Sequence, residues 1–501
     1  MSSNSTSPSS LLATVSSSDM SISLGLTRIT RLLQSLGSPH LSTPIVHIAG
    51  TNGKGSVSAY LSSILSESKL RVARFNSPHL VDEWDCIRVG EKEIEERQFR
   101  EVKSEVERVN EEGSLGATSF EVLTATAFAL FARSSPPLDI AVVEVGMGGV
   151  GDATNVVPAG QTLLSILTSV ELDHQAFLGD TVEQIAKVKA GIVREAGDLV
   201  VSEQKHHGVL EAAKEVAAEK GARLWQTGAA EPLKDEELSS TTTQQSLPAP
   251  RSVALPLSPT AVYPPSTIPS PSPPSISAHL PLPGSYQLAN ASTAVLAAHL
   301  LRTLPRTLAL QPKLAGISDV SIREGVEATR WPGRLQWLDL SSSTSSPTPQ
   351  PLSQPVPSRR ILLDGAHNPS SATLLAAYLS SLPRALRPST LIFGLSAPRA
   401  PASVLTPLVV AAETGIRKVI CVGFSPPVGM PWVKPTSTDL LAEAATELAF
   451  ETVEQARDVE EAFGKIGEGE GVVVAGSLYL VADALRWARR IGGTEAERGS
   501  S

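Results

Sequence analysis

The stretch that decides the fold is His47-Ile-Ala-Gly-Thr-Asn-Gly-Lys-Gly-Ser56. The apolar run 44–49 predicts a buried strand and residues 57–65 predict a helix, so that a glycine-rich turn joins the two. Glycines let the backbone turn so tightly that several N–H groups face one anion, and the helix N-terminus adds its dipole. Lys54 would reach the outer phosphates of a nucleotide, and the Ser56 hydroxyl would face magnesium. We therefore expect nucleotide phosphates to bind at Gly50, Thr51, Asn52, Gly53, Lys54, Gly55 and Ser56.

This loop departs from the standard P-loop pattern. The glycine expected five residues before Gly53 falls on Ile48, and Gly55 separates Lys54 from Ser56. A glycine-rich turn with a solvent-exposed lysine is therefore an alternative. A GTPase would also carry a phosphate loop, but the chain has no NKxD-type motif for reading guanine.

Working outward, other apolar runs predict the sheet to which this loop belongs. Residues 138–146 and 163–170 are continuous apolar runs, which is typical of parallel strands covered on both faces. Strand-like runs also alternate with helical segments from residue 360 to residue 490. A chain of 501 residues exceeds what one core usually serves. We expect an α/β fold, with a mainly parallel sheet in an N-terminal domain and a smaller Rossmann-like α/β domain after it.

Composition marks the limits of these domains. The N-terminal residues are rich in serine, and two internal stretches are dominated by Pro, Ser and Thr, which cannot bury enough apolar surface to become ordered. The expected organisation is a disordered tail at 1–20, a domain at 21–330 that carries the nucleotide-binding loop and a disordered insertion at 228–283, a second domain at 331–491 with an insertion at 341–358, and a disordered tail at 492–501.

Charge and composition exclude several classes of function. The formal net charge is -9 and aromatic residues make up only 4%, which argues against nucleic acid as a partner. Cys86 and Cys421 lie outside any CxxC pair, so we expect no disulfide framework and no thiolate zinc site. No apolar run reaches the ~18–20 residues of a membrane span, and the N-terminus lacks the basic residues of a targeting signal. A cytoplasmic protein without a membrane partner is the expectation.

Seven further stretches, in order along the chain, match one family. The loop GTNGKGS and these stretches resemble the folate branch of the Mur-ligase superfamily, the folylpolyglutamate and dihydrofolate synthases. The resemblance covers nearly the whole chain outside the insertions and tails, and it implies a Mur-ligase-like fold and an ATP-dependent ligase. The matching stretches are NSPHL at 76–80, EVGMGG at 144–149, DATN at 152–155, LDH at 172–174, KAGI at 189–192, WPGR at 331–334 and DGAHNP at 364–369.

The resemblance implies a magnesium site at Ser77, Glu144 and His174, and a carbamylated Lys189 that bridges to a second magnesium. Apart from the resemblance, the sequence itself shows that Glu144 ends an apolar strand, at the end where ligands bind in open α/β sheets. A carboxylate paired with an arginine is the alternative for Glu144, and an ordinary surface lysine is the alternative for Lys189.

Nucleotide and acceptor contacts follow from the same resemblance. Asn290, Arg334 and Asp364 match ATP-contacting positions, which would place ATP between the domains. An arginine fork suits a transferring phosphoryl group, and an aromatic ring with a carboxylate suits a flat heterocycle with N–H donors. Residues at the pterin-bearing substrate would be Thr118, Phe120, Glu121 and Asp152, although Phe120 could equally belong to the core. Catalysis is expected of Lys54, Lys189, His174 and Arg334.

The implied activity is addition of glutamate to a pteroyl carboxylate through an acyl phosphate. Asn52, where the eukaryotic polyglutamate enzymes more often have lysine, and segments 23–36, 429–432 and 476–480 resemble the fungal dihydrofolate synthases. We therefore expect 7,8-dihydropteroate, L-glutamate and ATP as substrates, Mg²⁺ as cofactor and a monomer. The alternatives are a folylpolyglutamate synthase, a bifunctional enzyme, a regulator without catalysis and a cell-wall Mur ligase, for whose N-terminal UDP-binding domain the residues before the loop leave no room. Val150, where the family has a basic residue, and segment 394–399 depart from its pattern.

Overall fold

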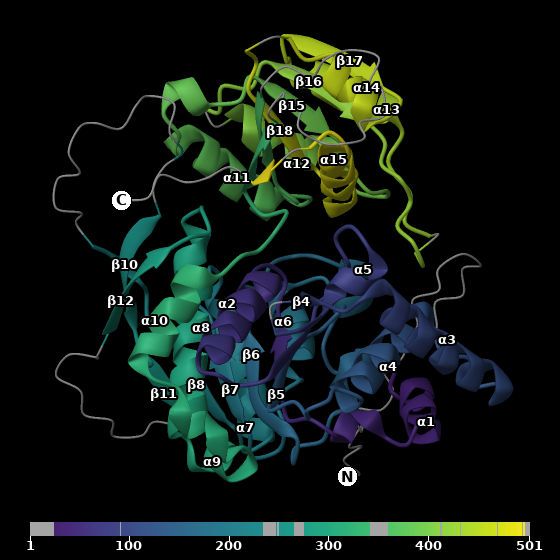
Figure 1. The fold of residues 1–501 in the computed structure, drawn as a ribbon. Coiled ribbons are helices and arrows are strands. Elements are labelled where there is room, and N and C mark those ends of the chain that lie inside the picture. The colour runs from purple at the N-terminus through teal and green to yellow at the C-terminus, as the bar shows by residue number, and fades with distance from the viewer. Residues whose placement is uncertain are drawn as a thin grey trace, which may run out of the picture.

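The computed structural model describes most of the chain as two α/β parts, the C-terminal part lying above the N-terminal part in Figure 1. The chain passes from one to the other over residues 329–335. The predicted insertion 341–358 and the predicted tail 1–20 lie outside the described residues. Described are residues 25–90, 92–233, 247, 250–264, 275–340, 359–410, 413–430, 432–467, 469–492 and 494–495.

The N-terminal part is built on a mainly parallel sheet, as the continuous apolar runs predicted. Its strands run in the order β11-β8-β7-β6-β1-β5-β2-β3-β4, in which β8 through β2 are parallel and the strands at both edges are antiparallel. The strands are β1 (Ile45–Ala49), β2 (Val72–Phe75), β3 (Ile87–Val89), β4 (Lys92–Glu93), β5 (Ile140–Glu144), β6 (Thr162–Leu167), β7 (Asp198–Val201), β8 (Arg223–Gln226) and β11 (Ala261–Tyr263).

Helices cover both faces of this sheet because successive strand residues point to opposite sides and both sides are apolar. Val46 and Ile48 of β1 pack towards α2, α8 and α10, whereas Ile45 packs towards α1, α3 and α4, and Ala49 towards α6 and α7. The helices are α1 (Thr27–Ser35), α2 (Lys54–Glu67), α3 (Glu96–Glu112), α4 (Ser119–Ala132), α5 (Gln175–Leu178), α6 (Val182–Ala190), α7 (His207–Glu219), α8 (Tyr286–Thr303), α9 (Pro305–Leu310) and α10 (Asp319–Ala328), with short 3-10 turns at η2 (Pro39–Leu41), η3 (Glu83–Cys86), η4 (Ala153–Val156) and η5 (Pro312–Gly316).

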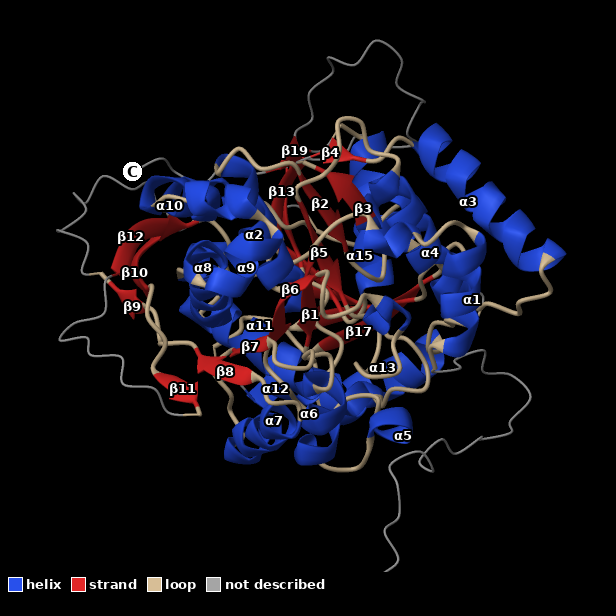
Figure 2. Ribbon diagram, turned by 90° about the horizontal axis from the view of Figure 1, so that it is seen from below, coloured by secondary structure: helices blue, strands red, loops and turns tan. Residues whose placement is uncertain are grey.

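The prediction of a disordered insertion at 228–283 is wrong for much of that range. β9 (Glu231–Pro232), β10 (Arg251–Pro256) and β12 (Ser275–Leu280) form a separate sheet that lies beside α10 in Figures 1 and 2. Val253, Leu255, Ile276, Ala278 and Leu280 are buried against α8 and α10. Burial alternates along β10 and β12, and in β12 apolar residues also alternate with polar ones, which suffices for a strand with one buried face. The surrounding prolines concealed that alternation.

The C-terminal part has its own sheet, in the order β17-β16-β15-β18-β14-β13-β19. β13 runs antiparallel to both of its neighbours, β14 and β19, and the other neighbouring strands are parallel. Helices α11, α12 and α13 cover one face, and α14 and α15 cover the other. β19 lies within the predicted C-terminal tail. The elements are β13 (Gln336–Leu340), β14 (Arg359–Leu363), α11 (Pro369–Ser381), η6 (Arg384–Leu386), β15 (Thr390–Phe393), α12 (Pro401–Val410), β16 (Lys418–Val422), α13 (Thr438–Glu447), β17 (Thr452–Ala456), α14 (Val459–Gly464), β18 (Val472–Ala475), α15 (Leu478–Arg490) and β19 (Thr494–Glu495).

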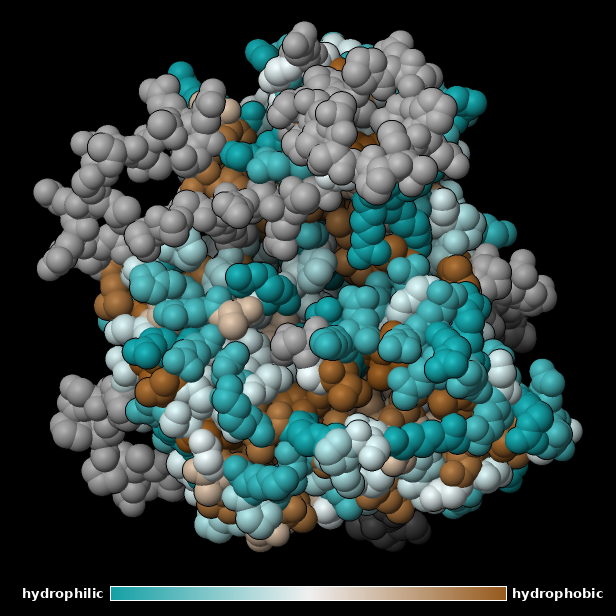
Figure 3. Space-filling view, in the orientation of Figure 1, coloured by the Kyte–Doolittle hydropathy of each residue, from teal (hydrophilic) through white to brown (hydrophobic). Residues whose placement is uncertain are grey.

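The outer surface of the N-terminal part is polar where α3 lies, at the lower right of Figure 3. Phe99, Val102 and Val106 turn one stripe of α3 into the core, and the exposed stripe carries i,i+4 ion pairs such as Arg100–Glu96. Among the described residues, no helix combines the length and the apolar character needed to cross a bilayer.

Close packing of α10 on α2 fixes the helix that follows the phosphate loop. A Cβ atom added to Gly325 would lie 2.3 Å from the Cα of Ile64. We predict that Gly325→Ala lowers the free energy of unfolding by about 1–3 kcal/mol through overpacking, which outweighs a gain of about 1 kcal/mol in helix propensity. Gly316→Ala is the control, because a Cβ atom at Gly316 meets nothing within 4 Å. Urea titration of both variants checks this, and equal stabilities would contradict it.

Candidate active site between the two sheets

A cavity of about 640 Å³ lies between the two parts of the chain. It opens where loops leave the carboxyl ends of β1, β5 and β6 in one sheet and of β14, β15 and β18 in the other, which is where open α/β sheets bind ligands. Predicted site residues that line it are Gly50, Thr51, Asn52, Gly53, Lys54, Gly55, Ser56, Ser77, Thr118, Phe120, Glu121, Glu144, Asp152, His174, Lys189, Arg334 and Asp364.

The glycine-rich loop joins β1 to α2, as predicted, and begins at a residue that only glycine can be. Gly50 has φ +150°, and a Cβ atom there would lie 1.9 Å from Thr168 Oγ1. The Thr168 hydroxyl donates to the carbonyl of Asn52 at 2.7 Å, which fixes the turn. The Lys54 ammonium donates to the carbonyls of Gly50 and Thr51, both at 3.2 Å. The lysine therefore folds back over its own loop into the cavity.

Asn290 on α8 lies against this loop rather than in the cavity lining. A Cβ atom on Gly53 would come within 2.4 Å of Asn290 Oδ1. The Asn290 amide donates to Gln287 Oε1 at 3.0 Å, and Gln287 in turn donates to Ser56 Oγ at 3.3 Å. Helix α8 thus supports the loop from the side.

Glu144 ends β5 as a fully buried carboxylate. Asn76 donates to its Oε2 at 2.6 Å, and Lys54 Nζ lies 3.8 Å from Oε1. The loop lysine is thus its ion-pair partner within 4 Å, and Arg334 and Arg74 act on it from farther away. Burial raises the pKa of Glu144, and Lys54 and the Asn76 hydrogen bond oppose that rise. The site therefore favours a further cation beside Glu144.

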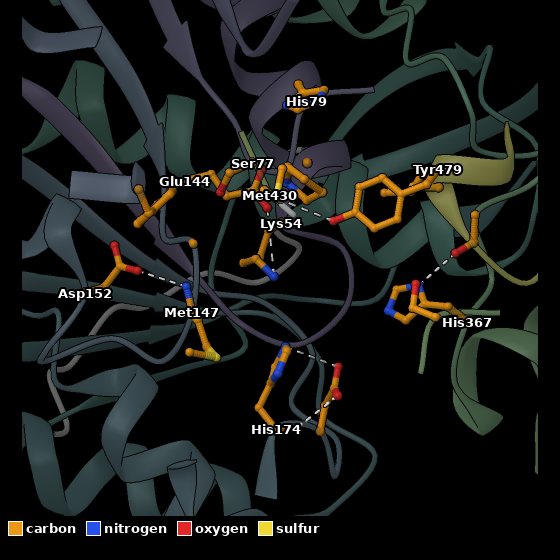
Figure 4. Close-up of a pocket in the computed structure, with 18 of the residues that line it drawn as sticks. Lys54, Ser77, His79, Glu144, Met147, Asp152, His174, His367, Met430 and Tyr479 are labelled. Carbon is orange, nitrogen blue, oxygen red and sulfur yellow. Dashed lines mark hydrogen bonds and ion pairs between the residues drawn. The ribbon is translucent and has the colours of Figure 1, made fainter. Parts of the chain in front are cut away.

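Ser77 adds a hard oxygen donor on the same side of the cavity. Its hydroxyl is buried without a hydrogen-bond partner in the described structure, and it lies with Glu144 in Figure 4. Oxygen donors of this kind fit Mg²⁺, which takes few protein ligands and keeps several waters. His174 lies on the other side of Lys54 from Ser77 and Glu144 in Figure 4, and a magnesium site at all three residues stays a prediction. The described residues hold no cluster of three or more His, Cys, Asp or Glu side chains suited to a metal.

Lys189 is not the surface lysine that the sequence left open. Only 4% of it is exposed, and its ammonium donates to the carbonyl of Gly50 at 3.0 Å. Burial, with repulsion from Lys54, lowers the pKa of Lys189 to about 7, although Asp173 and Asp152 act in the opposite direction. Lys187, two residues earlier, is exposed and pairs with Glu215 at 2.6 Å.

The predicted acceptor residues Thr118 and Glu121 form a helix cap. The Thr118 hydroxyl accepts from the Glu121 N–H, and Glu121 Oε2 accepts from the Thr118 N–H at 2.7 Å, a capping box at the start of α4. Arg28 on α1 also donates to Glu121 Oε2 at 3.0 Å. The spacing T-x-x-E predicts such a cap, a signal that we missed beside the family match. Glu121 Oε1 is buried without a hydrogen-bond partner in the described structure.

Phe120 and Asp152 border the same end of the cavity. Phe120 stacks on Phe75 with ring centroids 6.3 Å apart, and its ring lies where a Cβ atom on Gly146 would be. It is therefore both a core and a cavity residue. The Asp152 carboxylate accepts from the N–H of Met147 and from the N–H and hydroxyl of Thr154, so it is occupied within the protein.

The C-terminal part contributes Arg334 and Asp364. Asp364 accepts from the N–H groups of Leu335 and Ala366, both at 2.9 Å, and so ties the connection between the parts to the end of β14. Burial raises the pKa of Asp364, with Arg334 opposing. Arg334 donates to the carbonyl of Gly333 at 3.1 Å. Its position in the lining leaves the guanidinium beside the cavity.

Contacts across the cavity were not predicted from the sequence. Arg399 Nη2 lies 3.9 Å from Asp173 Oδ1, and the Ser370 hydroxyl donates to Glu171 at 3.4 Å. His367 Nδ1 lies 2.8 Å from the carbonyl oxygen of Gly365, a local hydrogen bond that orients the ring. Burial, then Arg399, lowers the pKa of His367 to about 4. No local pattern signals pairs so far apart in the sequence.

Val150, the departure from the family pattern, lies in the glycine-rich loop that follows β5. It is half exposed and packs against Gly191, where a Cβ atom would lie 2.1 Å from it. The structure therefore gives Val150 a packing role.

Comparisons with known proteins agree with this geometry. The model of the Mur ligase middle domain matches residues 48–298, and that of the dihydrofolate synthetase C-terminal domain matches residues 353–487. The dihydrofolate synthetase of Saccharomyces cerevisiae is 31% identical over 474 residues, which cover 93% of this chain and 98% of that protein. The probable dihydrofolate synthetase of Schizosaccharomyces pombe is 32% identical over 474 residues, covering 93% and 99%.

Solved structures share the fold over nearly the whole chain. A bifunctional folylpolyglutamate synthase/dihydrofolate synthase with Mn, AMPPNP and L-glutamate bound superposes with a TM-score of 0.67 at 26% identity. The match covers 93% of this chain and 95% of that one. The predicted Mur-ligase-like α/β fold is thus confirmed.

The ring of Trp331 packs closely against Gly55 of the phosphate loop. A Cβ atom on Gly55 would lie 2.4 Å from Trp331 Cζ2. We predict that Gly55→Ala weakens ADP binding at least about tenfold, measured by calorimetry. Adding Trp331→Leu should restore part of the affinity, because it removes the clashing ring. Gly160→Ala, with nothing within 4 Å of its new methyl group, is the control. Undiminished affinity in Gly55→Ala would show that the ring gives way.

Proposed function

The chain belongs to the family of dihydrofolate synthetases and folylpolyglutamate synthases, and we propose that it joins L-glutamate to 7,8-dihydropteroate. It is an ATP-dependent ligase of folate metabolism, as the family is. The observation that carries the assignment is one cavity that holds a phosphate loop, a buried carboxylate at Glu144 and a buried lysine at Lys189 between two α/β parts. The Saccharomyces and Schizosaccharomyces relatives are named dihydrofolate synthetases and match this chain over nearly their whole length, which favours dihydropteroate as the acceptor.

The reaction has two steps that share one acyl group. The acceptor carboxylate attacks the γ-phosphorus of ATP, so that an acyl phosphate forms and ADP leaves. The amine of glutamate then attacks the acyl carbon and loses a proton, and phosphate leaves as the amide forms. The protein contributes position and charge to both steps.

Named side chains supply that charge. Lys54, on the loop itself, and Arg334, from the opposite part, are cations on two sides of the site for the transferring phosphoryl group. Glu144 and Ser77 would hold Mg²⁺, which when bound neutralises phosphate charge. Water would hydrolyse the acyl phosphate, so the reaction needs the two parts of the chain to exclude water from the cavity once the substrates are bound.

Lys189 and His174 belong to the same proposal. Lys189 is buried, close to Lys54 and partly neutral near pH 7, which suits reaction of its amine with CO₂ to form an anionic carbamate. A carbamate there would replace the positive charge of Lys189 with a negative charge close to the Lys54 ammonium. His174 lies beside Asp173, whose carboxylate is 3.8 Å from its Nε2, and stays a candidate contact for the loaded site.

We further propose that the enzyme is cytoplasmic and acts as a monomer. A monomer suffices because loops of one chain complete the described cavity. The alternative is a folylpolyglutamate synthase, or an enzyme with both activities. The acceptor decides between them, because the first activity needs dihydropteroate and the second a folate that already carries glutamate.

We predict that purified protein, given ATP, Mg²⁺ and glutamate, adds a single glutamate to dihydropteroate and leaves a monoglutamylated folate unchanged, as identified by mass. Lys54→Ala should lower kcat at least about 100-fold, since it removes a cation from the transferring phosphoryl group. Extension of the folate alone would establish the alternative activity. Product from neither acceptor, with ATP still bound, would mean a protein without catalysis.

Carbamate formation on Lys189 makes a separate prediction. With ¹³C-labelled bicarbonate, a carbamate signal should appear by NMR and should vanish in Lys189→Arg. Lys187→Arg, which changes an exposed lysine two residues away, should keep the signal. Only the neutral amine reacts, so the signal should fall as the pH falls through about 7, the pKa of Lys189. A signal that survives Lys189→Arg would contradict the assignment.

A further inference from the structure

Beneath the phosphate loop lies a buried histidine that the mechanism does not use. His47 is the third residue of β1, three residues before Gly50, and none of it is exposed. Its side chain points to the opposite face from Val46 and Ile48 and reaches η4, where Nε2 lies 2.8 Å from Thr154 Oγ1. A buried polar side chain is costly unless it is bonded, so this contact needs an explanation.

The contact is the first link of a chain of hydrogen bonds. The Thr154 hydroxyl donates to Asp152 Oδ1 at 2.5 Å, and the Thr154 N–H donates to the same oxygen at 2.9 Å. Asp152 Oδ2 accepts from the N–H of Met147 at 2.9 Å. Thr154 is fully buried and Asp152 is 2% exposed. The chain therefore runs from β1 to the glycine-rich loop that follows β5.

The donors and acceptors fix the tautomer of His47. A hydroxyl has one proton, and that of Thr154 goes to the carboxylate of Asp152. At the His47 contact the hydroxyl must therefore accept, so Nε2 carries the proton and Nδ1 does not. His47 Nδ1 is buried without a partner in the described structure. Burial, then Arg194, lowers the pKa of His47 to about 3, so the ring stays neutral.

This series of hydrogen bonds reaches the cavity at Met147 and Asp152, and its other end, His47, lies three residues before the cavity-lining Gly50. Gly50 begins the phosphate loop on one side, and Gly146, Met147 and Asp152 line the acceptor end together with Phe120. The acyl phosphate forms only if the acceptor carboxylate reaches the γ-phosphate held by the first loop, and small misplacements are costly in such a step. A rigid connection between the two loops is what that alignment requires.

We infer that His47 is a positioning residue, which holds the acceptor loop 146–152 in register with the phosphate loop through Thr154 and Asp152. It acts on the reaction without touching a substrate. The inference rests on the proposed function for the identity of the acceptor, and on the hydrogen bonds alone for the connection.

The test combines kinetics with hydrogen exchange on the full-length protein. His47→Leu and Thr154→Val remove the hydrogen bonds that link His47 to Asp152. His47→Gln keeps an N–H donor, and Thr154→Ser keeps the hydroxyl. Ser165→Ala is the control, because Ser165 on β6 is the direct neighbour of His47 in the sheet and its hydroxyl donates to Ile192, outside the chain.

The breaking variants should raise KM for dihydropteroate at least about tenfold while KM for ATP stays within about twofold. Peptides covering 145–156 should exchange amide hydrogens faster, because the N–H groups of Met147 and Thr154 lose a fixed acceptor. The conservative variants should recover most of both effects, and Ser165→Ala should show neither.

Two results would overturn the inference. One is unchanged exchange over 145–156 in His47→Leu, and the other is a rise in KM for ATP equal to that for the acceptor. If the wild-type protein does not use dihydropteroate but His47→Leu still loosens 145–156 alone, the proposed function fails and the connection between the loops stands.

Discussion

Two lysine ammonium groups share the carbonyl oxygen of Gly50, and the chemistry of the cavity depends on that contact. Lys54 donates to it at 3.2 Å and Lys189 at 3.0 Å. The contact requires a glycine, since any side chain at Gly50 would occupy the position of Thr168. Two cations so close, one of them buried, make a site that favours polyphosphate and lower the pKa of the inner lysine. Glu144, 3.8 Å from Lys54, limits the accumulated charge.

A second constraint is the direction of the strands. Parallel strands bring their carboxyl ends to the same edge of a sheet, so the loop from β1, Glu144 at the end of β5 and Thr168 after β6 meet without any contact between their sequences. The C-terminal sheet presents Asp364 after β14 in the same way. Because both sheets turn these ends towards one cavity, Asp173 and Arg399 can lie opposite each other.

The fold and half of the site could be read from local patterns. Apolar runs around a glycine-rich turn predicted the strand, loop and helix, because local geometry sets both the turn and its phosphate site. The alternation of polar and apolar residues in Ser275–Leu280 also indicates a strand, β12, but the frequent prolines around it predict disorder. The pairing of Arg28 with Glu121 joins residues 93 positions apart, and no local rule contains it.

The two carboxylates at the acceptor end of the cavity, Asp152 and Glu121, differ in whether an oxygen remains to accept a hydrogen bond from a ligand. Asp152 accepts one hydrogen bond from Met147 and two from Thr154, so both of its carboxylate oxygens are engaged within the protein and hold a loop in place. Glu121 uses only Oε2, for Arg28 and Thr118, and keeps a buried Oε1 without a hydrogen-bond partner in the described structure. A buried acceptor in that state is costly until a donor arrives. A pterin carries N–H donors, so of the two residues Glu121 is the one from which we expect direct recognition, and Asp152 the one that keeps the neighbouring loop in place.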